Sequence, residues 1–217
     1  MKFRITILSD VESWLSDSIA SLVDSWKTDG RHIVKWVHNQ KDIPVGNFCF
    51  ILGYTQKVKK NFLKKNQHNL VVHESSLPQG KGWSPLSWQI LEGKNVITIT
   101  LFEAEEDLDS GAIYIQEDMK FEGHELVNEL RHIQSKYTIK LCKKFVSNYP
   151  EIVQKPIPKL GVETSYPRRH PVDSVVDHNS PISDQFNLLR IVDNDKYPAY
   201  FEMKGYRYEL RINKILI

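Results

Sequence analysis

Runs of apolar residues recur at short intervals along the first half of the chain and predict β-strands. Residues 48–52 are continuously apolar, which is typical of a strand covered on both faces. Residues 95–102 alternate and are rich in β-branched side chains, which also favours a strand. The predicted strands comprise residues 3–8, 32–38, 47–53, 69–73, 95–102 and 112–121.

Apolar residues three or four positions apart predict helices between these strands. The first helix carries an apolar stripe over residues 14–26, and Ser9-Asp10 can cap it. A short helix over residues 84–93 begins with Ser-Pro and ends at Gly, and residues 124–148 form a long amphipathic helix. A further helix, whose cations we expect on a solvated face, contains Lys57, Lys59, Lys60, Lys64 and Lys65.

Alternating strands and helices predict an α/β fold over residues 1–150, with a mostly parallel sheet flanked by helices. Pro150, Pro156 and Pro158 break this pattern and predict a linker. Residues 151–217 are expected to form this linker and a small C-terminal α+β tail, which is too short to stand alone and should dock against the sheet. The tail contains a predicted helix and a hairpin, near residues 183–193, 199–203 and 206–212.

Composition narrows the class of protein. The 217 residues are 41% hydrophobic and 26% charged with a net charge of +2, so we expect neither disorder nor general nucleic-acid binding. No stretch approaches the roughly 18 apolar residues of a membrane helix, and the N-terminus lacks a secretory pattern. Cys49 and Cys142 lie in segments expected to be buried and reduced. We therefore expect a cytoplasmic protein, without a metal site.

One imidazole and one carboxylate follow neighbouring predicted strands. His73 ends the strand 69–73, and Asp109 follows the strand that ends at Phe102. In parallel α/β sheets, ligands bind beyond the carboxyl ends of the strands, where the loops diverge. We therefore expect both side chains to reach one crevice, although each alone is also typical of a packed histidine and a turn-forming aspartate.

The residues around this pair resemble the folate-dependent formyltransferases, whose motifs are close to Asn-x-His-x-Ser-Leu-Leu-Pro, Gly-x-x-Pro and Leu-Asp-x-Gly-x-Ile. The resemblance keeps order and spacing over residues ~50–117. It implies a formyltransferase-type Rossmann-like fold and 10-formyltetrahydrofolate as the cofactor. The matching motifs are Val71-Val-His73-Glu-Ser75-Ser-Leu77-Pro78, Gly82-Trp-Ser-Pro85 and Leu108-Asp109-Ser-Gly111-Ala-Ile113.

The stretch Pro167-Arg168-Arg169-His-Pro171 resembles the segment after the catalytic domain in methionyl-tRNA and sugar formyltransferases. Because the chain ends at Ile217, we expect it to lack the C-terminal barrel with which the tRNA enzyme holds its substrate. The resemblance is therefore to short sugar N-formyltransferases of pseudaminic-acid-type pathways. It implies that a monomer or homodimer transfers a formyl group to a nucleotide-linked 4-amino-4,6-dideoxy sugar, in surface-glycan or flagellin sugar biosynthesis, without nucleic-acid or membrane partners.

In that family the histidine stabilises an oxyanion or moves a proton, the aspartate orients the histidine, and an asparagine binds the formyl oxygen. His73 and Asp109 match the first two positions and are the implied catalytic residues. Val71 stands at the third position, and its side chain offers no hydrogen bond. Asn69 shares its strand face but lies about 13 Å from His73. The other candidate donors are Ser75, Ser76, Gln56 and a backbone N–H near Gly82.

The resemblance places the pterin of the cofactor between two loops, where mostly main-chain groups bind it. A nucleotide sugar needs cations for its diphosphate and flat surfaces for its base. Arg168 could instead pair with Asp173 or Asp177, and Trp83 could pack under its loop. The implied cofactor-binding residues are Gly53, Tyr54, Gln56, Lys57, Val58, Glu103, Ala104, Glu105 and Asp107. The implied substrate-binding residues are Ser75, Lys81, Gly82, Trp83, Arg168 and Arg169.

Two alternatives stay open. Glycinamide ribotide formyltransferase shares the motifs around His73, although the Arg168-Arg169 stretch is not expected of it. Val71 also allows a non-catalytic protein that binds folate or a nucleotide sugar.

Overall fold

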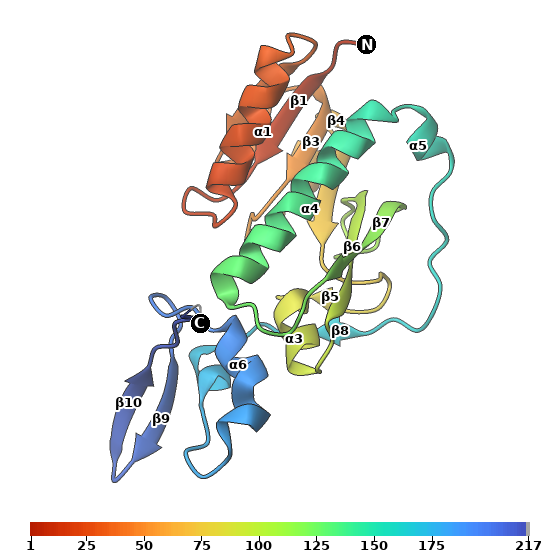
Figure 1. Ribbon diagram of the computed structural model, residues 1–217. Coiled ribbons are helices and arrows are strands. Elements are labelled where there is room, and N and C mark those ends of the chain that lie inside the picture. The colour runs from red at the N-terminus through yellow and green to blue at the C-terminus, as the bar shows by residue number, and fades with distance from the viewer. Residues whose placement is uncertain (216–217) are drawn as a thin grey trace.

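The apolar segments of the first half of the chain form one six-stranded sheet in the order β2-β1-β3-β4-β6-β7 (Figure 1). The structure is a computed structural model that describes residues 1–215. Each strand falls on a predicted one, and β4 begins earlier than predicted. The strands are β1 (Arg4–Leu8), β2 (Ile33–Val37), β3 (Gly46–Ile51), β4 (Asn66–His73), β6 (Val96–Glu103) and β7 (Ile113–Lys120).

The direction of β6 differs from the alternating pattern. β1 pairs in parallel with β2 and β3, and β3 pairs in parallel with β4. β6 is antiparallel to both β4 and β7, so the sheet is mostly parallel with one strand reversed. The reason is the short connection. The 7-residue helix α3 (Pro85–Leu91) rises only about 10 Å, whereas the 8 residues of β4 span about 26 Å, so the chain re-enters the sheet from the edge where β4 ended.

Two long helices cover one face of the sheet, α1 (Ser16–Thr28) and α4 (Val127–Ser147) (Figure 1). Their predicted apolar stripes pack on the sheet in one large core. The segment between β3 and β4, with the single helical turn α2 (Lys60–Leu63), covers a smaller core on the other face. Three 3₁₀ turns complete the helical elements: Gln40–Asp42, Pro171–Ser174 and Ile182–Gln185.

Three predicted helix features are wrong. α1 begins at Ser16 because the predicted caps are used elsewhere: Asp10 accepts the N–H of Thr55 at 3.0 Å, and Ser9 Oγ accepts the indole N–H of Trp36 at 2.8 Å. The lysine-rich segment contains only the turn α2. Ser84 precedes α3 as predicted, but its left-handed backbone (φ 49°) leaves its side chain without a capping hydrogen bond.

The segment predicted as a linker is bonded to the rest of the molecule. After α4, the short helix α5 (Glu151–Gln154) leads into an extended stretch that returns along the sheet (Figure 1). There the Ile157 N–H donates to the Ile113 carbonyl at 2.8 Å. Further on, β8 (Ser165–Tyr166) pairs in parallel with β5 (Lys81–Gly82), and neither strand was predicted.

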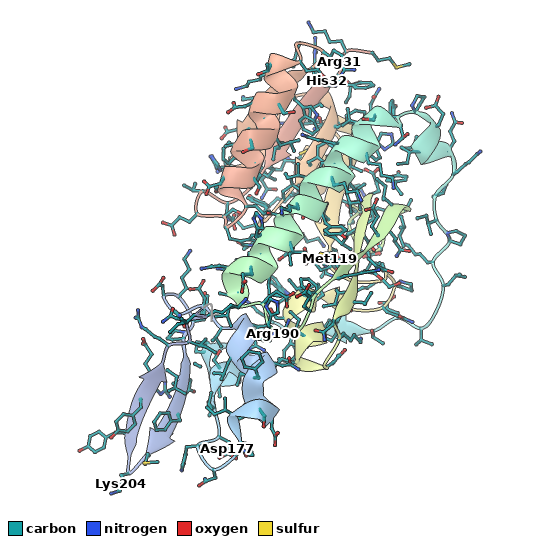
Figure 2. All side chains as sticks on the ribbon, in the orientation of Figure 1. Arg31, His32, Met119, Asp177, Arg190 and Lys204 are labelled. Carbon is teal, nitrogen blue, oxygen red and sulfur yellow. The ribbon has the colours of Figure 1, made fainter. Side chains whose placement is uncertain are left out.

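The helix of the C-terminal tail makes its main contacts with α3 and α4, whereas we expected the tail to dock against the sheet. Its helix α6 (Phe186–Ile191) and the hairpin β9 (Ala199–Met203) and β10 (Tyr206–Leu210) share a small apolar core of their own. Figure 1 shows the hairpin extending away from the sheet. At the junction, which Figure 2 marks with Arg190, the buried guanidinium bonds the buried Glu125 carboxylate at 2.9 Å.

Both cysteines are free and buried, as predicted, and burial raises the pKa of each thiol. Among the described helices, none is both long and apolar enough to cross a lipid bilayer.

Candidate functional site

His73 ends β4, and one hydrogen bond fixes its buried side chain. Its Nε2 lies 2.8 Å from the carbonyl oxygen of Gly80. A carbonyl can only accept, so Nε2 carries a proton, and in the neutral form of the imidazole Nδ1 keeps its lone pair. Within residues 1–215 no group is hydrogen-bonded to Nδ1. Nδ1 is therefore the nitrogen that can accept a proton from a ligand.

Asp109 reaches His73 from the loop between β6 and β7. Its Oδ2 lies 3.9 Å from His73 Nε2 and accepts the Gly82 N–H at 2.9 Å. At this distance the carboxylate acts on the imidazole through its charge, and not through a hydrogen bond. The two side chains are close, as expected, but for another reason. Asp109 does not follow a parallel strand; its loop begins at the far end of the reversed strand β6 and folds back towards His73.

Both side chains are therefore bonded to one short segment, residues 80–82, which the C-terminal part of the chain holds in place. Thr164 accepts the Gly80 N–H through Oγ1 and the Lys81 N–H through its carbonyl, each at 2.9 Å. Pairing with Tyr166 in β8 continues the contact. This contact could not be predicted from the sequence, because strands of two residues leave no periodic pattern.

These hydrogen bonds limit which group could replace the family asparagine as the donor to the formyl oxygen. Val71 packs with Phe102 and Ile157 and offers only apolar atoms. Ser75 is buried beneath Gly80, with its Oγ unpartnered among the described residues. The N–H groups of residues 80–83 are all engaged, by Thr164, Asp109 and Tyr166. Of the suggested donors, the exposed side chains of Ser76 and Gln56 are still free to reach a ligand.

A hollow of about 490 Å³ lies beside the second of the two loops that the resemblance assigns to the cofactor, residues 103–107. Side chains of α2 and β4 line one side, and Glu105, Glu106 and Asp107 line the other. Asn69 in its wall is 6% exposed; its Nδ2 donates to the Leu63 carbonyl at 2.9 Å, whereas its Oδ1 has no partner among the described residues. An unpaired buried acceptor is costly, and the N–H edge of an aminopyrimidine would satisfy it. The residues present therefore fit a pterin.

Two implied cofactor residues, Glu105 and Asp107, line this hollow, and the other implied cofactor residues do not. Glu103 is committed to the fold: its carboxylate bonds His68 at 2.9 Å and the Tyr114 hydroxyl at 3.0 Å, and burial together with that carboxylate raises the pKa of Tyr114. Three of the implied cofactor residues pack in the smaller core: Tyr54, Val58 and Ala104. Three further implied cofactor residues are exposed: Gly53, Gln56 and Lys57.

Two arginines lie on two tryptophans beside residues 80–82. The Arg168 guanidinium carbon is 4.9 Å from the ring centre of Trp83, and that of Arg169 is 5.4 Å from Trp88. Trp83 is 38% exposed and is therefore not packed under its loop. Among the described residues, Arg168 forms no ion pair with an aspartate, and Arg169 keeps a buried, unpartnered Nη1. Burial lowers the pKa of Arg169. The implied anion site thus retains unsatisfied donors.

Lys81, another implied substrate residue, is less free than Arg168. Its ammonium lies 2.8 Å from the Glu163 carboxylate, so part of its charge is already balanced.

Glu74, next to His73, is a residue that sequence reasoning missed. It is half-buried, and its Oε1 accepts a hydrogen bond from Gln134 Nε2 of α4 at 2.6 Å. Its backbone carbonyl accepts one from Gln89 Nε2 of α3, also at 2.6 Å. The signal that could have revealed it is a carboxylate directly beside the candidate histidine, at a position where the family pattern is unspecific.

Comparison with known proteins places this site in a family. The sequence model described as Formyl transferase matches residues 35–137, a stretch that includes both His73 and Asp109. Residues 35–137, just under half of the chain, are thus similar to the formyl transferase family. Formyl-tetrahydrofolate is the cofactor of this family, in agreement with the fit of the hollow.

A curated relative of this formyl transferase domain is the methionyl-tRNA formyltransferase of Thermodesulfovibrio yellowstonii. It is 24% identical over 173 residues, which make up 78% of this chain and 55% of the relative. The chain thus spans about half the length of that protein.

Solved structures share the fold. Methionyl-tRNA formyltransferase from Clostridium thermocellum has a TM-score of 0.82 at 18% identity, covering 98% of this chain and 93% of that one. A 4-N formyltransferase from Francisella tularensis has a TM-score of 0.71 at 16% identity, with 98% and 99% covered. HypX from Aquifex aeolicus, solved in complex with tetrahydrofolic acid, has a TM-score of 0.74 at 17% identity, with 97% and 37% covered.

Proposed function

We propose that this protein transfers a formyl group from 10-formyltetrahydrofolate to a primary amine. The observation that carries the proposal is the pair His73 and Asp109, fixed together on residues 80–82 within a formyl transferase domain. Formyl transfer needs a group that accepts a proton from the amine and charge that stabilises the imidazolium then formed. His73 Nδ1 has the free lone pair, and the Asp109 carboxylate has the charge.

The cofactor, when bound, supplies the formyl carbon on its N10. Asn69 of this chain would bind the far edge of the pterin, and His73 would lie at the formyl end. The two residues are four positions apart on one strand face, about 13 Å, a span comparable to a pterin with its methylene and N10.

For the acceptor we propose a nucleotide-linked amino sugar, of the 4-amino-4,6-dideoxy type. Two arginines on two tryptophans supply cations for a diphosphate and flat surfaces for a base. The 4-N formyltransferase from Francisella tularensis matches this chain over nearly the full length of both. Pseudaminic-acid-type surface-glycan biosynthesis is the pathway we propose for such a product.

A second candidate acceptor is methionyl-tRNA, because curated relatives and a solved structure with that name match the chain. Those relatives extend well beyond the matched region, so the activity of this chain must be tested directly.

The test is a transfer assay with purified protein, 10-formyltetrahydrofolate and a panel of acceptors: UDP-, dTDP-, GDP- and CMP-linked amino sugars, glycinamide ribotide and methionyl-tRNA. We expect an amino sugar to gain the mass of one formyl group, and His73→Ala to abolish the gain. His132→Ala, on α4, is the matched control and should transfer normally. Ligand binding without transfer to any acceptor would contradict the enzymatic proposal.

A further inference from the structure

Glu74 occupies a junction of three elements at the site. It follows His73 at the end of β4, α3 holds its carbonyl through Gln89, and α4 holds its Oε1 through Gln134. Its second carboxylate oxygen, Oε2, forms no hydrogen bond to another residue within residues 1–215. The side chain is thus held in place by a neutral amide, and one of its oxygens is not bound to another side chain.

Within residues 1–215, no lysine or arginine forms an ion pair with Glu74. α3 contains no titratable side chain, and Arg131, one turn before Gln134 on α4, is bound to Asp193 at 2.8 Å. The charged or titratable groups that act on Glu74 are His73, whose charge lowers the pKa of Glu74, and Asp109, which repels the Glu74 carboxylate. Among the described residues, no lysine or arginine lies within ion-pair distance.

A half-buried carboxylate that forms no ion pair with a lysine or arginine lowers the stability of the folded protein. Burial raises the pKa of Glu74 above its ordinary 4.5, against the opposing effects of His73, Gln134 and the backbone N–H of Glu74 itself, and Asp109 adds a smaller upward shift. Glutamine would fill the same volume and keep the bond to Gln134 without this cost. Such a residue beside a candidate catalytic histidine is typical of a functional carboxylate.

We propose that Glu74 is the residue that binds the ammonium group of the acceptor and takes up the proton which that group must lose. This inference rests on the proposed function. The proton moves from R–NH₃⁺ to the Glu74 carboxylate and leaves R–NH₂. The amine nitrogen then forms a bond to the formyl carbon, the bond from that carbon to folate N10 breaks, and the second amine proton passes by way of His73 Nδ1 to N10. Glu74 thereby selects an amine over a hydroxyl at the same position.

The first experiment needs no acceptor: thermal unfolding of the wild type and Glu74→Gln from about pH 4 to about pH 8. Because the pKa of Glu74 is raised in the native state, the unfolded chain loses this proton first, and wild-type stability falls as pH rises above 4.5. Glu74→Gln lacks this loss. Its Tm should equal that of the wild type near pH 4 and exceed it at neutral pH.

The matched control is Glu151→Gln, at an exposed glutamate without an ion pair among the described residues, whose Tm should follow the wild type throughout. A Glu74→Gln variant that is less stable than the wild type at neutral pH would overturn the proposal. It would mean that the charged carboxylate is bound within the protein itself.

The second experiment measures recognition, with dTDP-4-amino-4,6-dideoxyglucose and its 4-hydroxy counterpart as probes. The wild type should bind the amine about ten-fold more tightly than the alcohol, and Glu74→Gln should bind both alike. In transfer assays Glu74→Gln should raise KM for the amine by about ten-fold or more. Normal transfer and normal KM in Glu74→Gln would overturn this inference and leave the proposed function intact. If the wild type transfers to no amine, the proposed function fails, and the Tm series still decides whether Glu74 lacks a counter-ion.

Discussion

At the scale of single residues, the backbone of residues 80–82 does what a direct hydrogen bond between His73 and Asp109 would otherwise do. The Gly80 carbonyl selects the tautomer of His73, and the Gly82 N–H holds Asp109 at 3.9 Å from it. The imidazole is thus oriented by a peptide carbonyl and tuned by a carboxylate.

Val71 is the residue whose replacement should increase activity. An amide at this position would supply a donor on the same strand face as His73, and a donor to a developing oxyanion contributes roughly 100-fold or more to kcat. We expect Val71→Asn to raise kcat/KM for formyl transfer by about ten-fold or more, at a cost of about 1–3 kcal/mol of stability from burying an amide. Steady-state kinetics and urea unfolding check this. Val71→Leu is the control, and equal rates for the two variants would contradict the prediction.

His73 and Asp109 could be predicted from the sequence because each lies in a motif of the family. The residues that surround them in the fold could not be predicted. The roles proposed for Glu74 and Asn69 follow from partners that are absent among the described residues. No lysine or arginine pairs with the Glu74 carboxylate, and no donor bonds Asn69 Oδ1. Such absences depend on packing from α2, α3 and α4, and no local pattern encodes them.

At the scale of elements, the reversed strand β6 explains how the site is assembled. Because β6 enters the sheet at the edge where β4 ends, the loop carrying Asp109 begins at the opposite edge and must fold back towards His73. Strand positions could be predicted from apolar runs, whereas strand direction depends on the length of the connection. The length of α3 was the available signal: 7 residues are too few to return along β4.

The contact between β5 and β8 should be sensitive to one methyl group. Gly82 has φ +95°, and a Cβ there would collide with the Tyr166 carbonyl oxygen. Gly82→Ala should push β8 away, displace the N–H that holds Asp109, and lower kcat on the order of 100-fold. Gly93 also has a positive φ, +83°, but nothing lies within 4 Å of its Cβ position. Gly93→Ala should therefore cost only about 1 kcal/mol and leave transfer unchanged. Equal kinetics for both variants would contradict the role of the contact.

At the scale of the whole molecule, one buried ion pair joins the C-terminal tail to the sheet domain. The Arg190 guanidinium, with a side chain 2% exposed, bonds the carboxylate and the carbonyl of Glu125. Backbone N–H groups of residues 122 and 123 also donate to this carboxylate. Desolvation opposes ionisation of Glu125, but these hydrogen bonds outweigh it and lower its pKa. No sequence pattern indicates this pair, because the two residues lie far apart along the chain.

Breaking this pair should destabilise the molecule strongly. Arg190→Ala leaves a buried carboxylate unpaired and should cost about 3–5 kcal/mol in urea unfolding at neutral pH. Because the pKa of Glu125 is lowered, the contribution is present above pH 4.5 and is lost as pH falls through the lowered pKa, so the two proteins should converge in acid. Arg31→Ala, which removes an exposed pair with Asp29, is the control and should keep the wild-type midpoint. A midpoint for Arg190→Ala equal to that of the control would contradict the prediction.

The extended stretch from Ile157 to Tyr166 has a consequence for where the chain can be divided. It bonds β7 at Ile113, and through Thr164 and Tyr166 it holds residues 80–82, to which His73 and Asp109 are attached. A fragment that stops at the prolines would contain both residues of the pair and the whole sheet, yet not the part that orders them. A fragment that is to keep the site ordered, in a fusion, a truncation or a split protein, therefore has to include this stretch.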